Sequence, residues 1–177
     1  MEKLQKELFE LQPTIKDICL REKESLPSSL LFSQQKITAG ENYKGLPYLV
    51  MDYPRVFERQ DLMTFRTMIW WGNEASLTLH LQGKYWDKYQ NLVIKNLKET
   101  ASQNLNWCVN STPWEYHFEP DNYLPISDVS DFSNDKKFCK ISRKLPLSSL
   151  EKLPTFIEES TTLFLTLLEA NNGKRDS

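Results

Sequence analysis

Apolar side chains recur at spacings of three and four residues in three segments of the chain, which is the pattern of an amphipathic helix. The first segment opens the chain, and its apolar positions are Leu4, Leu8, Leu11, Ile15 and Ile18. Pro13 lies inside this segment and lacks a backbone donor, so we expect a kink or two abutting helices there. The stripe could form a dimer seam, but packing on the chain's own core is favoured because five positions are too few to indicate a coiled coil.

The other two helical segments lie in the middle and at the C-terminal end of the chain. The middle helix is predicted over residues 84–102, and its apolar side is formed by Trp86, Tyr89, Val93 and Leu97. The last helix is predicted to begin at Pro154, because proline suits the first turn, and to end at the helix stop Asn172–Gly173. Its buried positions would be Phe156, Ile157, Leu163, Phe164, Leu167 and Leu168.

Between the helices, shorter segments rich in β-branched and aromatic residues predict strands. Apart from a hairpin, these are residues 30–38, 46–53, an interrupted strand within 106–118, and 137–143. A turn is expected at residues 39–42, Pro54 is expected to stop the second strand, and residues 121–135 are expected to be loop. Because strands occur in runs, the sequence predicts an α+β fold: a mainly antiparallel sheet with an N-terminal, a middle and a long C-terminal helix packed on it.

The clearest local pattern is a hairpin over residues 64–81. Gly72-Asn73 separates its two strands, and a two-residue loop of this kind suits a type II′ turn because glycine accepts the positive φ required. Such a loop would pair Arg66 with Leu79 and sort the side chains into two faces. The first face carries Arg66, Met68, Trp70, Ala75, Leu77, Leu79 and Leu81, of which the three leucines are expected to be buried together. The second, mixed face carries Phe65, Thr67, Ile69, Trp71, Glu74, Ser76, Thr78 and His80.

Length and charge limit the classes of protein to consider. The chain has 177 residues, 40% of them hydrophobic, which is enough for one domain over residues 1–173, followed by a frayed tail at residues 174–177. The net charge of −2 lacks the basic excess typical of nucleic-acid-binding domains, so no nucleic-acid partner is predicted. A basic strand that includes Lys140 follows an acidic loop, and we interpret it as a solvated, self-neutralising surface.

The ends of the chain and its cysteines indicate a compartment. The N-terminus is charged from the start, and the apolar runs are too short to cross a bilayer, so neither a secretory signal nor a membrane partner is predicted. Cys19, Cys108 and Cys139 are widely spaced and odd in number, which fits buried free thiols in a reducing compartment. We therefore predict a cytoplasmic protein.

Familiar catalytic motifs do not occur in the sequence. There is no glycine-rich phosphate loop, no G-x-S-x-G, no H-E-x-x-H and no C-x-x-C, so no cofactor is predicted. The spacing Glu115-x-His117-x-Glu119 would place three potential zinc or iron ligands on one side of a strand, with His80 as another nitrogen donor. We favour a polar outer face for these residues, and predict no metal, because metal sites normally show clearer spacing.

Arginine supplies the remaining candidate chemistry. The group Arg55, Arg59 and Arg66 is interleaved with Asp52, Glu58 and Asp61. Internal salt bridges are favoured here over an anion site, although the planar guanidinium suits both. Arg66 is distinctive, because the hairpin register places it among leucines, where an unpaired charge is expensive. We expect it to be shielded from water, either paired with a carboxylate such as Asp52 or bordering a pocket near Trp71 or His80.

The mixed hairpin face gives the function that we predict. Aromatic walls with a few hydroxyls, one carboxylate and one imidazole are typical of a small-molecule pocket, and equally of the solvent side of an antiparallel sheet. We predict a non-catalytic module that binds a small molecule or another protein through Arg66, Trp71, Glu74, Thr78 and His80. The alternatives are an enzyme with His80 or His117 as general base and an arginine that fixes an anionic substrate, or a metal-binding domain.

Overall fold

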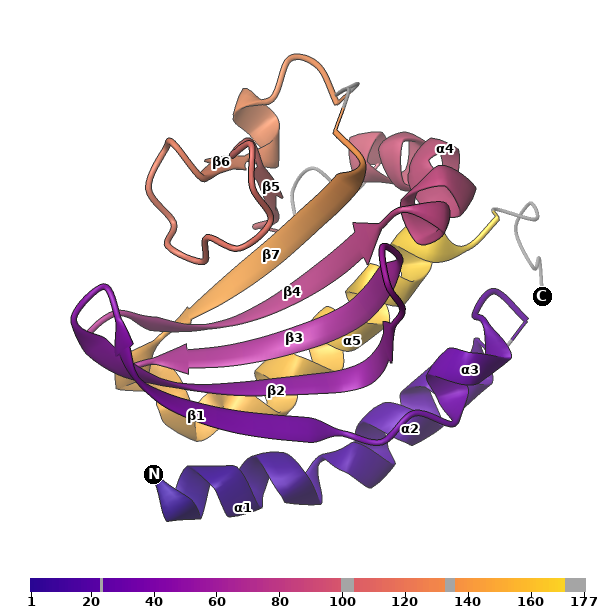
Figure 1. Cartoon of the computed structure of the whole chain (residues 1–177). Coiled ribbons are helices and arrows are strands. Elements are labelled where there is room, and N and C mark those ends of the chain that lie inside the picture. The colour runs from indigo at the N-terminus through magenta and orange to yellow at the C-terminus, as the bar shows by residue number, and fades with distance from the viewer. Residues whose placement is uncertain (23, 100–103, 133–135, 171–177) are drawn as a thin grey trace.

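A computed structural model describes residues 1–22, 24–99, 104–132 and 136–170 of the chain. Seven strands form one sheet in the order β1-β2-β3-β4-β7-β5-β6, and neighbouring strands pair antiparallel (Figure 1). The strands are β1 (Lys36–Tyr43), β2 (Leu46–Phe57), β3 (Leu62–Trp70), β4 (Glu74–Gln82), β5 (Asn106–Cys108), β6 (Tyr123–Pro125) and β7 (Phe138–Pro146). The predicted α+β class with an antiparallel sheet is confirmed.

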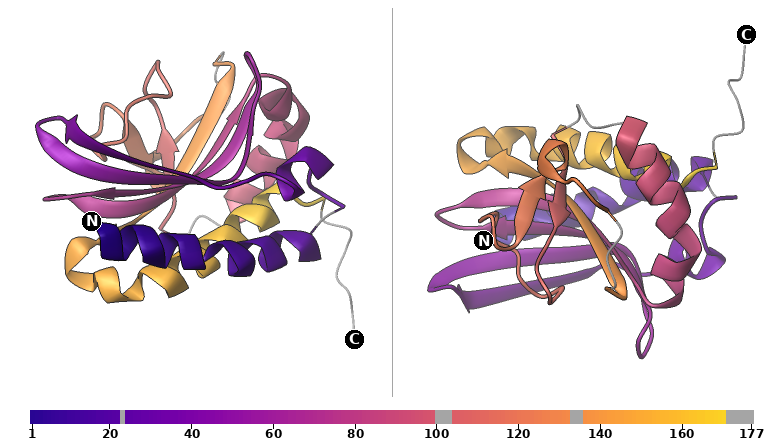
Figure 2. Two further views of the ribbon diagram at one scale, coloured as in Figure 1. Left: turned by 60° about the horizontal axis from the view of Figure 1, so that its bottom comes forward. Right: turned by 90° about the horizontal axis from the view of Figure 1, so that it is seen from above.

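The helices gather on one face of this sheet (Figure 2). The α-helices are α1 (Glu2–Glu10), α2 (Gln12–Arg21), α3 (Ser28–Leu31), α4 (Lys84–Glu99) and α5 (Leu153–Leu168). Two 3-10 turns, η1 (Ile126–Asp128) beside β6 and η2 (Leu147–Lys152) before α5, complete the helical elements. The break between α1 and α2 falls at Leu11, and Pro13 occupies the first turn of α2, as predicted. Helix α5 ends at Leu168, before the predicted stop; residues 171–177, like the predicted end of the middle helix at 100–102, lie outside the described residues.

The β3–β4 hairpin forms where it was predicted, but its loop is one residue longer. The loop is 71–73, because β3 ends at Trp70 and β4 begins at Glu74. The amide of Asn73 donates to the carbonyl of Trp70 at 3.1 Å, and Gly72 has a φ of 80°, which glycine adopts readily. The glycine was therefore identified correctly, whereas the turn type and the register were not.

The longer loop shifts the register by one residue and changes which side chains share a face. Arg66 pairs with Thr78, not with Leu79, and the predicted two-face assignment is wrong for β3. The helix-covered face carries Phe65, Thr67, Ile69, Ala75, Leu77, Leu79 and Leu81. Burial of the three leucines on one face is confirmed, and the ring of Phe65 lies 6.3 Å from that of Phe164 in α5.

Several strand boundaries differ from prediction, and the strand expected at residues 30–38 begins only at Lys36, after helix α3. Strand β2 continues through Pro54, because the register shifts between Asp52 and Arg55 and leaves the proline, which lacks a donor, outside the regular ladder. The peptide bond before Pro54 is cis. Residues 39–42, which were predicted to be a turn, belong to strand β1. Gly40 permits close approach of the Tyr48 ring on the neighbouring strand, because a Cβ at this position would come within 2.3 Å of that ring.

The C-terminal half contains the largest departure from prediction. Strand β5 stops at Cys108, and residues 109–122 are irregular instead of continuing as a strand to Phe118. We call residues 109–122 the cover segment, because it lies over the sheet face that the helices leave free (Figure 2). The expected loop that follows includes β6 and η1, whereas β7 confirms the strand predicted at 137–143.

The thiols of Cys19, Cys108 and Cys139 are buried and free, as predicted. Within the described ranges, no helix is long and apolar enough to cross a membrane.

Candidate ligand-binding site

A row of polar side chains crosses the sheet beneath and beside the cover segment. Paired residues on adjacent strands share a face, so the row can be followed from one strand to the next. It contains Lys36 on β1, Asp52 on β2, Arg66 on β3, Thr78 on β4, Ser142 on β7 and Asn106 on β5. Asp52, Thr78 and Ser142 are buried, although each is polar. The sheet therefore has two buried faces, one apolar under the helices and one polar under the cover segment.

Arg66 and Asp52 form the central ion pair of this row. The carboxylate accepts hydrogen bonds from Nε of Arg66 at 2.7 Å and from Nη2 at 2.9 Å, which is the bidentate geometry that the planar guanidinium favours. The side chains are 13% and 8% exposed, so the expected shielding of Arg66 and its pairing with Asp52 are confirmed. Nη1 donates to the hydroxyl of Tyr116 in the cover segment, whose ring also lies beneath the guanidinium.

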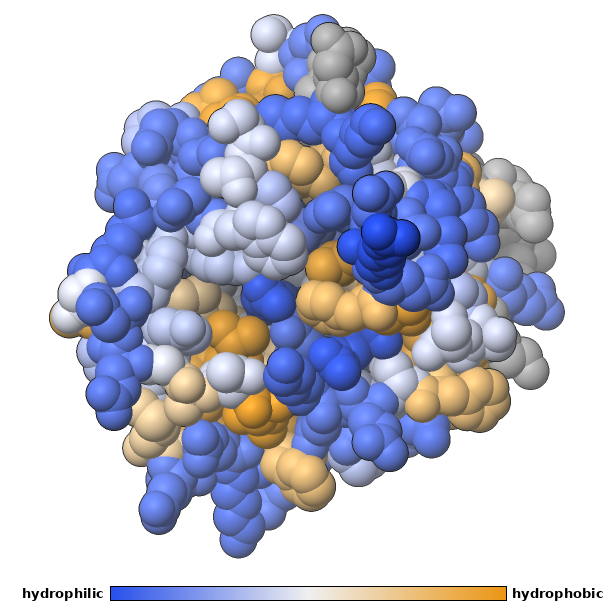
Figure 3. All heavy atoms as spheres, viewed as in Figure 1, coloured by the Kyte–Doolittle hydropathy of each residue, from blue (hydrophilic) through white to orange (hydrophobic). Residues whose placement is uncertain are grey.

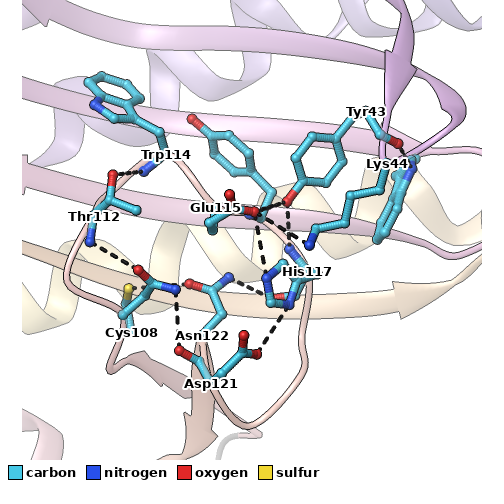
Figure 4. Close-up of polar contacts among 12 residues, drawn as sticks. Tyr43, Lys44, Cys108, Thr112, Trp114, Glu115, His117, Asp121 and Asn122 are labelled. Carbon is cyan, nitrogen blue, oxygen red and sulfur yellow. Dashed lines mark hydrogen bonds and ion pairs between the residues drawn. The ribbon is translucent and has the colours of Figure 1, made fainter.

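Tyr43, at the end of β1, holds the cover segment in place (Figure 4). Its hydroxyl donates to Oε2 of Glu115 at 2.8 Å and accepts from the amides of Tyr116 at 2.8 Å and His117 at 3.3 Å. Burial raises the pKa of Tyr43 to about 12, so the hydroxyl stays protonated and available as a donor at neutral pH. Asn122 adds a hydrogen bond from its side-chain amide to the carbonyl of His117.

A pocket of about 450 Å³ opens between the cover segment and strands β1 to β3. Thr38, Val50 and Met68 come from adjacent strands in one register row and line its floor. Aromatic side chains line its walls: Tyr43, Tyr48, Phe57 and Tyr116. Figure 3 shows this side of the molecule, where hydrophobic surface appears between hydrophilic side chains near the middle of the face.

Charged groups occupy one end of the pocket lining. Lys36, Arg55 and Arg66 are its cations, and Asp52 is its one carboxylate among the described residues. Arg55 donates from Nε to the carbonyl of Gln34 and lies over the ring of Phe57. The salt bridging expected within the arginine group is thus limited to Arg66 and Asp52 in the described part of the chain.

The structure brings Arg66, Thr78 and His80 onto the same face, but only Arg66 lines this pocket. Thr78 is buried and lies 2.8 Å from the hydroxyl of Ser142. His80 is 2% exposed and contacts the rings of Trp114 and Phe138 edge-on. Burial, followed by the charges of Lys140 and Arg66, lowers the pKa of His80 to about 3, so its imidazole is neutral at neutral pH.

The other two predicted ligand-binding residues lie elsewhere. Trp71 is partly buried against the helix-side core, so it does not border the Arg66 pocket as one hypothesis required. Glu74 lines a separate hollow of about 210 Å³ together with His117 and Glu119. Burial is the main cause of its raised pKa, with the charge of Glu119 contributing further and Lys144 opposing.

The spacing that suggested a metal site does not form one strand face, because residues 115–119 are irregular. Glu115 lies 3.6 Å from Nε2 of His117, whereas Asp121 lies 3.7 Å from Nδ1, so the two carboxylates approach different ring nitrogens and do not converge with the imidazole on one metal position. Among residues that the structure describes, no three or more His, Cys, Asp or Glu side chains could hold a metal ion together.

Lys140 is the residue that sequence reasoning placed least well. It was interpreted as part of a solvated basic strand, yet it is 1% exposed. Its ammonium donates to the carbonyl of Glu115 and lies 4.7 Å from the centre of the Tyr116 ring and 5.1 Å from that of Tyr123. Burial lowers the pKa of Lys140 to about 8. Strict alternation along β7 was the available signal, since it places Lys140 on the same face as Ser142.

The arrangement can bind a molecule that has both an apolar and a charged part. Rings and aliphatic side chains line one part of the pocket, and oriented N–H donors line another. Comparison of the chain with models of protein families, with curated proteins and with solved structures found no match.

Proposed function

We propose that this protein is a non-catalytic module that binds a small molecule in the pocket between the cover segment and strands β1 to β3. Arg66 is the observation that carries the proposal. It is held by Asp52 and Tyr116 at the pocket lining, and these contacts use three of the five N–H donors of a guanidinium. A buried, oriented arginine with donors left over is suited to a ligand, and orientation before binding reduces the entropy lost on binding.

Shape favours a small molecule over a protein partner. A volume of about 450 Å³ lies within the range of about 300–1,000 Å³ typical of small-molecule pockets. The walls come from rings of β1, β2 and the cover segment, and Tyr43 fixes the spacing of the cover segment from the sheet. Such a concave, aromatic-lined site encloses a ligand, whereas protein interfaces bury much larger areas.

The positions of the two histidines favour binding over catalysis with a histidine base. His80 is enclosed and its pKa is lowered to about 3, which makes it a weak base. His117 follows Tyr116 in the sequence and lines the smaller hollow together with Glu74. Neither histidine is among the described residues that line the Arg66 pocket.

A blocking substitution tests the proposal. Thr38 is exposed on edge strand β1 and lines the pocket, so Thr38→Trp should fill the opening without disturbing the core. Ala39→Trp is the matched control, because Ala39 is exposed on the same strand but points to the opposite face. We expect a fragment screen by protein-observed NMR to give hits that shift resonances of Val50 and Met68 in the wild type and the control, and to lose them in Thr38→Trp. Hits that are absent from the wild type, or that persist in Thr38→Trp, would contradict the proposal.

A further inference from the structure

We infer that the ligand of this pocket is an aromatic organic anion, with a carboxylate or phosphate group against the cations and a flat ring against the tyrosines. The inference rests on the proposed function, because it names the ligand class of the same pocket.

The charge of the lining is opposite in sign to that of the whole chain. The described lining has three cations and one carboxylate, an excess of two positive charges, whereas the chain carries a net charge of −2. Asp52 is already bound to Arg66 through both oxygens. Lys36 pairs with Asp52 in the strand register and makes no ion pair with any described residue. The pocket therefore attracts anions, and an incoming anion would not meet a free carboxylate.

The geometry of the ion pair directs Arg66 toward such a group. Asp52 occupies the side of the guanidinium formed by Nε and Nη2, and Tyr116 occupies one donor of Nη1. One N–H on each Nη remains, and N–H donors of a guanidinium are suited to carboxylate and phosphate oxygens. Lys36 lies on the other side of Asp52 in the polar row and lines the same pocket, so its long side chain is placed to contribute to the same anion site.

The rings account for the flat part of the ligand. Tyr43 is the centre of the group: its ring centroid lies 6.3 Å from that of Tyr48 and 5.9 Å from that of Tyr116, both in edge-on orientation. Edge-on neighbours leave ring faces and edges that a planar ligand can stack on, and such contacts add to the burial of apolar surface. Val50 and Met68 provide the apolar floor below.

Three naphthalene compounds test the inference, and the test is titration calorimetry at low salt. 2-Naphthoate carries a carboxylate, 2-naphthyl phosphate carries a phosphate, and 2-naphthamide is their neutral counterpart. We expect at least one anion to bind about tenfold or more tightly than the amide, because charge-assisted hydrogen bonds form only with the anions. The anion that binds more tightly identifies the head group.

Charge-neutralising variants locate the binding. Lys36→Gln/Arg55→Gln should remove most of the anion preference, again a change of about tenfold. Lys95→Gln/Lys98→Gln is the control, because it removes the same charge from exposed positions on α4 and should leave affinity unchanged. Both pairs lie outside the Arg66–Asp52 contact, so the fold is expected to be intact.

The possible failures are distinguishable. Equal binding of the amide and the anions, abolished by Thr38→Trp, would overturn the anion inference and leave the proposed function standing. If none of the three naphthalene compounds binds while neutral fragments bind the pocket, the anion inference is likewise overturned and the proposed function stands. Anion binding that is unaffected by both Thr38→Trp and Lys36→Gln/Arg55→Gln would place the site elsewhere and overturn both.

Discussion

The helix-covered face and the face under the cover segment are formed by the same strands but bury side chains of opposite character. Under the helices lie residues such as Leu77, Leu79 and Phe65, each no more than 1% exposed. One residue further along the same strands, under or beside the cover segment, lie Arg66 and His80, which are ionisable. Alternation along a strand therefore places the charged groups on one face and the leucines on the other.

Burial has different requirements on the two faces. An apolar face is stabilised in proportion to the area removed from water. A buried polar face is stable only where its groups find partners, because unpaired charges and donors lose their hydration. Asp52, Arg66 and Tyr116 satisfy one another, whereas Nε2 of His80 has no hydrogen-bond partner among the described residues. Because burying this polar face costs free energy that packing alone does not offset, we expect the binding site on this face.

The largest predicted effect comes from breaking the ion pair on the polar face. Asp52→Ala would leave the guanidinium of Arg66 enclosed without its carboxylate, and we expect a loss of about 3–5 kcal/mol in the free energy of unfolding. Urea denaturation measures it. Glu58→Ala is the control, since Glu58 forms an exposed ion pair with Lys84, and it should have little effect. Equal losses in the two variants would show that Arg66 is not dependent on Asp52.

On the apolar face, truncation should cost about as much for a different reason. Leu79 is 0% exposed and lies in the centre of the helix-covered sheet, so Leu79→Ala should leave a cavity. The expected loss is about 2–5 kcal/mol, the usual range for a buried leucine. A loss below about 1 kcal/mol in urea denaturation would mean that this face is not the packed core.

Lys140 gives a pH-dependent test of the polar face. Its pKa is lowered by burial from 10.5 to about 8, so between these pH values the unfolded chain binds more protons than the folded one. Stability contributed by this site should therefore rise as pH increases from 8 to 10.5, and be lowest below pH 8. The total change is on the order of 3 kcal/mol. It is measured as the difference in unfolding free energy between wild type and Lys140→Met across this range, and a constant difference would indicate that Lys140 is solvated.

A smaller effect is expected at the attachment of the cover segment. Tyr43→Phe removes the hydroxyl that accepts from the amides of Tyr116 and His117. We expect a loss of about 1–3 kcal/mol and faster hydrogen exchange at these two amides, because they lose their acceptor. Tyr48→Phe, on the same wall, is the control. Unchanged exchange in Tyr43→Phe would show that the cover segment is held by other contacts.

Local patterns were sufficient for most of the fold. Helical spacing predicted α1, α2, α4 and α5, because each buries one stripe, and Gly72 marked the hairpin. The register failed because two- and three-residue loops use similar residues, yet a single added residue exchanges the faces. Gly40 and Pro54 were interpreted as residues that end strands. Gly40 instead makes room for the ring of Tyr48, and Pro54 lies at a register shift between β2 and β3. Both roles depend on the pairing of strands, which the local sequence does not show.

The site was less predictable, because its parts are distant in the chain. The pairing of Arg66 with Asp52 could be anticipated, since a charge directed toward the interior requires a partner. The contact of Tyr43 with Tyr116 joins residues 73 positions apart, and no periodicity connects them. The cover segment itself has no regular structure, so its position over the sheet depends on these contacts and not on a local pattern.

The central claim is that the Arg66–Asp52 pair serves ligand binding more than stability, and the double variant Asp52→Leu/Arg66→Met tests it most directly. Replacing both charges by apolar side chains removes the pair without leaving an unpaired charge. We predict an unfolding free energy equal to or above that of the wild type, together with at least about tenfold weaker binding of the naphthalene anion that binds the wild type. Unchanged anion affinity, or a loss of stability as large as that of Asp52→Ala, would contradict the account.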